Sequence, residues 1–140
     1  MALLDDIGAR LLASGLASSS GVGGYVLTKS WMPDSSAMQD KIVALFQTPG
    51  GPPNPRTELD HPAFQVMVRG GSVAKSTGAY ADAESKADAI KRDLHALVLT
   101  SSSGRYYPGI IAQQDPFLLE HDAQRRPVLV VNFLAMRSRT

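Results

Sequence analysis

The sequence contains no cysteine, few aromatic residues and no excess of charge of one sign. Without cysteine, the chain has no disulfide, no thiolate nucleophile and no cysteine-ligated zinc or iron–sulfur site. The 14 basic and 13 acidic residues are spread along the chain, so no basic block marks a nucleic-acid site. No apolar run approaches the roughly 18 residues that a membrane-spanning helix needs.

What the chain does have is enough apolar material for one globular domain. Of its 140 residues, 44% are hydrophobic and 19% are charged. A chain of this length buries about two-thirds of its unfolded surface, so we expect a single domain over residues 1–140. Asp5 and Asp6 stand where a secretory signal would carry Lys or Arg, and we therefore expect the protein to begin in the cytoplasm.

Two segments show the three- and four-residue spacing of amphipathic helices. Leucine and isoleucine recur between Leu3 and Leu16. This spacing predicts a helix over residues 2–16, ended by the Ser/Gly run 18–24. Apolar residues recur in the same way from Tyr80 to Leu97 and predict a second helix over residues 79–98.

The remaining apolar segments have the character of β-strands. Strands are predicted over residues 41–46, 64–69, 106–114 and 128–136, with a further short extended piece at 25–28. Four prolines and two glycines in residues 48–55 predict a long loop there, and exclude a helix or a central strand. The order of elements predicts an α+β fold, in which a mostly antiparallel sheet of four strands, or slightly more, packs against two main helices.

No motif for catalysis or cofactor binding is complete. The segments 24–30 and 70–76 end in Lys-Ser like a phosphate-binding loop, but Thr28 and Ala74 occupy the position where that loop needs glycine. The three histidines lack the spacing of a metal site, and no Gly-x-Ser-x-Gly motif occurs. We predict no catalytic, cofactor-binding or metal-binding residues, no cofactor and no enzymatic activity.

An interaction protein is the class that remains. Trp31, Met32 and Tyr107 are candidates for exposed anchors, because Trp, Tyr and Met are enriched at protein interfaces. The alternative for Trp31 is that it closes the core, since Trp is heavily buried on average.

The order of several short motifs along nearly the whole chain resembles the minor capsid or tail-terminator proteins of long-tailed bacteriophages. The likeness is greatest in the Val-Arg-Gly at 68–70 before the second helix and in Asn132-Phe133 near the end. The other parts of the pattern are Met32-Pro33-Asp34, the strand 41–46, the Pro/Gly run 48–53, the segment 110–116 and the acidic-to-basic turn 122–126.

This resemblance implies a structural virion protein without a cofactor. Such a protein forms a homo-hexameric ring on the last ring of the tail tube, ends tube polymerisation and joins the tail to the head connector. Its expected partners are other copies of itself, the tail-tube protein and the head–tail connector protein, with no membrane and no sequence-specific nucleic acid, although the ring lumen could pass DNA. Its expected location is the head-proximal end of the virion tail, after assembly in the host cytoplasm.

The resemblance also suggests which residues meet neighbouring chains. The loops 18–24, 48–59 and 119–127 are expected to face neighbours or the tube. The candidate subunit or partner interface residues are Trp31, Met32, Arg69, Lys75, Asp82, Glu84, Asp122, Arg125 and Arg126. Two alternatives stay open: a head-completion or connector stopper protein and, more distantly, a small hydrolase or nuclease.

Overall fold

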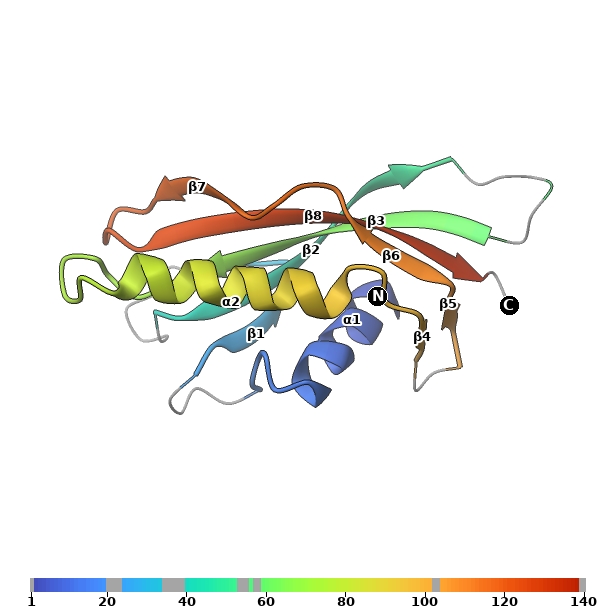
Figure 1. Ribbon diagram of the computed structural model, residues 1–140, viewed down its shortest axis with the longest axis horizontal. Helices are drawn as coiled ribbons and strands as arrows, with labels where there is room; N and C mark the ends of the chain where they lie inside the picture. Colours follow the sequence, from blue (N-terminus) through green and yellow to red (C-terminus); the bar gives the residue numbers. More distant parts are fainter. Residues whose placement is uncertain are drawn as a thin grey trace.

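The computed structural model describes residues 2–19, 24–33, 40–52, 56, 59–101 and 104–138. Two helices and eight strands lie in this part of the chain (Figure 1). In chain order they are α1 (Ala2–Ala13), β1 (Val26–Lys29), β2 (Ile42–Gly51), β3 (Leu59–Arg69), α2 (Ala79–Leu94), β4 (Leu99–Thr100), β5 (Tyr106–Tyr107), β6 (Gly109–Ala112), β7 (Phe117–His121) and β8 (Pro127–Ser138).

Six of the strands form one large sheet, in the order β1-β2-β3-β8-β6. The sixth, β7, lies on the same side of β8 as β6 but pairs with the opposite end of that strand. β1 and β2 are parallel, and the other pairs are antiparallel. The short strands β4 and β5 make a separate two-stranded sheet.

Both helices pack on the same face of this sheet, and none of the described residues forms a helix on the other face (Figure 1). The alternate residues of β3 and β8 that point toward the helices are buried, and Phe64 and Phe133 stack with their ring centroids 5.0 Å apart. The apolar stripe predicted for α2 is confirmed, because Ala83, Ala87 and Ile90 are buried in this core.

The predicted sheet is wrong in two respects, although the α+β class holds. The described sheet has six strands, where four or slightly more were predicted, and the parallel β1–β2 pair makes it mixed. The direction of β1 was not predictable, because its four residues show that the segment is extended but not which strand it pairs with or in which direction. The segment 106–114 also contains two strands, β5 and β6, instead of one.

Two strands extend beyond their predicted ends. β2 continues past Phe46 through Pro49 to Gly51, so part of the predicted loop 48–55 is strand. Proline is tolerated there because β1 pairs only with Ile42–Leu45, which leaves the outer half of β2 at the edge of the sheet. Correspondingly, β3 begins at Leu59, five residues before the predicted start.

Both helices end earlier than predicted. In α1 the helix stops at Ala13, and Gly15 then takes a positive φ of 76°, a conformation that favours glycine. In α2 the helix stops at Leu94, and the backbone N–H of Ala96 donates a hydrogen bond of 2.6 Å to the carbonyl of Ile110 in β6. A tertiary contact therefore ends α2 where the helical spacing would continue to Leu97.

Candidate assembly surface

Two of the predicted interface residues, Arg69 and Arg126, are almost fully buried. Arg69 ends β3, and its guanidinium donates hydrogen bonds to the backbone carbonyls of Asp40, at 2.9 Å, and of Pro33. Arg126 donates to the carboxylates of Asp122, at 2.7 Å, and of Asp40, at 3.2 Å. The two arginines thus bind Pro33 and Asp40 beside the end of β3 and the start of β8.

Asp122 organises the turn that precedes β8. Its carboxylate accepts hydrogen bonds from the backbone N–H groups of Gln124 and Arg126, at 3.0 and 2.9 Å. Burial favours the neutral form, but the hydrogen bonds from the backbone and guanidinium of Arg126 outweigh it and lower the pKa of Asp122. Asp122 is thus ionised and fixed within this turn.

Lys75 and Arg125 are exposed and lie on two turns that hydrogen-bond to each other. The backbone N–H of Val73 donates to the carbonyl of Arg125 at 3.0 Å, and the Ser72 hydroxyl donates to the carbonyl of Gln124 at the same distance. Arg125 has a positive φ of 58°. These paired turns, residues 72–76 and 122–126, form a cationic end of the sheet.

Asp82 and Glu84 are exposed on α2 but differ in their surroundings. Asp82 accepts a 2.8 Å hydrogen bond from the hydroxyl of Tyr25, whose pKa is raised by burial and by this carboxylate. The same hydrogen bond, helped by Lys41 at 3.3 Å, lowers the pKa of Asp82. Glu84 lines an open depression of about 420 Å³ together with Asp88 and Asp115.

The predicted anchors Trp31 and Met32 differ in how far their side chains are exposed. Trp31 is 54% exposed, and its carbonyl accepts a 2.8 Å hydrogen bond from the hydroxyl of Thr28. Met32 is half-buried and borders a depression of about 200 Å³ with Arg69 and Asp122.

The prediction of an exposed Tyr107 is wrong. Its side chain is fully buried, and its hydroxyl donates a 2.5 Å hydrogen bond to the carboxylate of Asp6 in α1. Burial, followed by this carboxylate, raises the pKa of Tyr107 to about 12. Tyr107 therefore ties α1 to the fold and is not a surface anchor.

The predicted interface residues are therefore only partly brought together. Arg69, Asp122 and Arg126 share the hydrogen-bond network, and Met32 borders it. Lys75 and Arg125 share the cationic end, whereas Trp31, Asp82 and Glu84 lie elsewhere. Of the predicted contact loops, residues 20–23, 53–55, 57 and 58 lie outside the described residues, as does Asp34 of the motif 32–34. Contact of these residues and loops with other chains stays a prediction.

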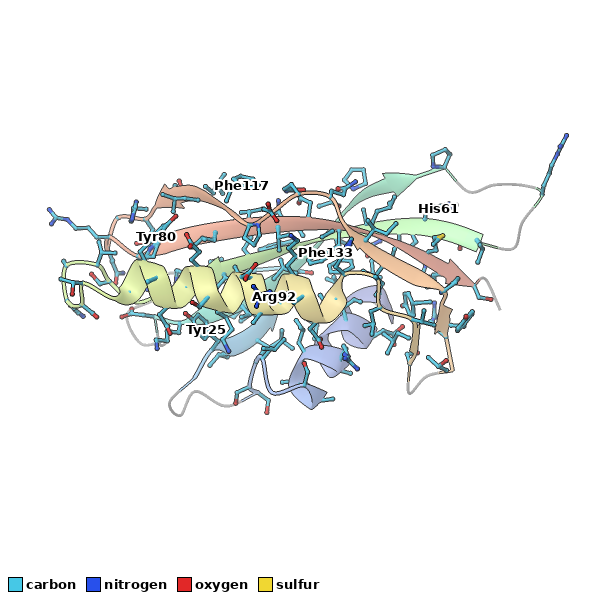
Figure 2. The ribbon with its side chains drawn as sticks, viewed as in Figure 1. Tyr25, His61, Tyr80, Arg92, Phe117 and Phe133 are labelled. Carbon is cyan, nitrogen blue, oxygen red and sulfur yellow. The ribbon has the colours of Figure 1, made fainter. Side chains whose placement is uncertain are left out.

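The sequence interpretation missed the most exposed apolar segment of the described chain, β7. All five of its residues are exposed, including Phe117, Leu118 and Leu119 in succession. Figure 2 shows Phe117 at this edge of the sheet, on the side away from Tyr25 and β1. The available signal was the run Phe-Leu-Leu after Pro116, which the polar turn that follows it obscured.

The described residues contain no group of three or more potential metal-ligating side chains. None of the helices in the described ranges is long and apolar enough to cross a membrane. Three features distinguish the described residues: a buried arginine network, a cationic end and an exposed apolar strand at a sheet edge. The class of the molecule is a small α+β protein with one large mixed sheet.

Comparison with known families identifies the chain more closely. The model of the family described as bacteriophage tail terminator protein matches residues 18–138. The chain belongs to this family, and it is a structural protein of the phage tail. No curated protein shows a significant match to the chain.

Proposed function

We propose that six copies of this chain form a ring on the last ring of the tail tube. The ring ends tube polymerisation and joins the tail to the head connector. The observation that carries the proposal is the family match, which spans residues 18–138 and so includes every strand of the large sheet.

A difference between the two ends of the large sheet supports the proposal. One end carries the cationic turns with Lys75 and Arg125, and at the other end the outer half of β2 and the start of β3 project beyond α2 (Figure 1). A head-to-tail contact repeated by rotation closes into a ring with two chemically different faces. One face would bind the tube, and the other would present a surface on which another tube ring does not assemble.

Removal of the protein from an infection tests the proposal. Electron microscopy of particles made without it should show tails of abnormal length that are not joined to heads, and wild-type protein supplied in trans should restore both features. Tails of normal length that fail to join heads would contradict the terminator function and would favour a connector stopper.

A further inference from the structure

The edge of the sheet formed by β7 is open and apolar. Phe117, Leu118 and Leu119 are 43%, 38% and 52% exposed. Native proteins normally cover such an edge or protect it with charge, because its unpaired backbone groups can bind another strand. The neighbouring strand β6 is protected in this way, since Ala96 and Ala112 donate backbone hydrogen bonds to Ile110 and to the ring of His95. In the described part of the chain, nothing pairs with the outer side of β7.

The opposite edge of the sheet is also open over half its length. β1 covers Ile42–Leu45 of β2, and Ser18 in turn closes β1 through hydrogen bonds with Tyr25 and Leu27. β2 continues for six more residues, from Phe46 to Gly51, and no described residue pairs with its outer side there. The sheet therefore has one free segment on each side, β7 and this outer half of β2.

The directions of these two segments suit a contact between copies related by rotation. β2 is antiparallel to β3, β3 to β8 and β8 to β7, so β7 runs antiparallel to β2. When copies are placed side by side without being turned over, β7 of one copy therefore meets β2 of the next in the antiparallel direction. Such a contact is heterologous and can repeat around a ring.

The positions of the two segments along the sheet suit the same arrangement. β7 pairs with Pro127–Val130 of β8, whereas the outer half of β2 is level, through β3, with the part of β8 from Asn132 to Met136. This offset is about 19 Å, and the four strands β2, β3, β8 and β7 are about as wide. Strands tilted by about 45° to the ring axis would bring the segments level, and closed β-barrels have tilts of roughly 35–45°.

The two free segments belong to the same chain and match in direction and in offset along the sheet. This match favours a second copy of the chain as the occupant of the β7 edge.

We propose that β7 of one subunit pairs, antiparallel, with the outer half of β2 of the next copy and buries Phe117, Leu118 and Leu119. This inference rests on the proposed ring and names the contact that closes it. Main-chain hydrogen bonds provide the pairing, and the apolar side chains of β7 add the burial that stabilises it.

Because the natural chain has no cysteine, two single-cysteine variants test the contact directly. Leu119→Cys and Gln47→Cys proteins are mixed with tail tubes and treated with a short bismaleimide crosslinker. The expected product is a heterodimer that forms in the mixture and from neither variant alone. A homodimer of Leu119→Cys alone, or rings that form in the mixture without any heterodimer crosslink, would overturn the proposed contact.

An aspartate substitution provides the second test. Leu119→Asp should raise the protein concentration needed for ring assembly at least tenfold, as measured by light scattering, while its circular dichroism and melting temperature stay those of the wild type. Val98→Asp is the matched control, because Val98 is 60% exposed and lies outside the large sheet. It should assemble like the wild type.

The outcomes separate this inference from the proposed function. Wild-type rings together with unchanged assembly of Leu119→Asp would overturn the β7 contact but leave the terminator function intact. A wild-type protein that stays monomeric both alone and with tail tubes would contradict the ring itself.

Discussion

Buried charge is the most unusual feature of the molecule at the scale of single residues. Arg69 and Arg126 both contact Asp40, one through its backbone and the other through its side chain. The sequence could show only two arginines next to strands, which usually lie in solvent. Their burial depends on Asp40, which is 29 residues from Arg69 and 86 from Arg126 in the chain. No local pattern encodes contacts across such separations.

Replacement of Arg126 tests the strength of this network. Arg126→Met should lower the free energy of unfolding by about 2–4 kcal/mol, because the carboxylates of Asp40 and Asp122 lose their cation and keep only part of their access to water. Urea denaturation measures the change. Arg92→Gln is the control, since the exposed Arg92–Asp88 pair should contribute about 0.5 kcal/mol or less. Equal effects of the two substitutions would contradict the role of the network.

Asp122 also predicts how stability depends on pH. Its pKa is lower in the folded than in the unfolded chain, so it stabilises the fold above the unfolded value, near 3.8, and this contribution is lost as the pH falls through the folded pKa. Asp122→Asn should therefore be less stable than the wild type at pH 7 and lose less stability on acidification. Free energies of unfolding measured between pH 7 and pH 3 test this. Parallel curves would show that Asp122 is not responsible.

At the scale of elements, local patterns predicted the long segments well and the edges of the sheet poorly. The spacing of Ala83, Ala87, Ile90 and Leu94 identified the buried face of α2, because a helix of this length repeats its pattern several times. β7 was missed because five residues that are exposed on both faces have no alternation. The outer half of β2 was missed because Pro49 is acceptable only at an edge, and the sequence does not show where the edge lies.

Close packing between elements can be tested at Gly70, which follows β3 and contacts α2. A methyl group there would lie 2.8 Å from the Cβ of Ala83 and 3.1 Å from the carbonyl oxygen of Ala79. Gly70→Ala should therefore lower the free energy of unfolding by about 1–3 kcal/mol. Gly78→Ala is the control, because nothing lies within 4 Å of the added methyl group, and it should change stability by less than about 1 kcal/mol. Thermal denaturation that ranks the two variants in the reverse order would contradict this packing.

At the scale of the whole molecule, the large sheet has an unpaired strand segment at each of its two edges in the described residues. Family membership identifies a structural protein of the phage tail, and the free segments at β7 and at the outer half of β2 explain how one fold could join copies in a ring. The order of motifs in the sequence was sufficient to suggest the family. The candidate contact could not be predicted, because it depends on strand order, strand direction and offset, which only the folded sheet shows.

The most direct test of the account is the structure of the head-proximal end of the assembled tail by cryo-electron microscopy. The account predicts a single ring of six copies of this chain on the last tube ring, with β7 of each copy beside the outer half of β2 of the next. A tail end without this chain, or one with a different number of copies, would contradict it.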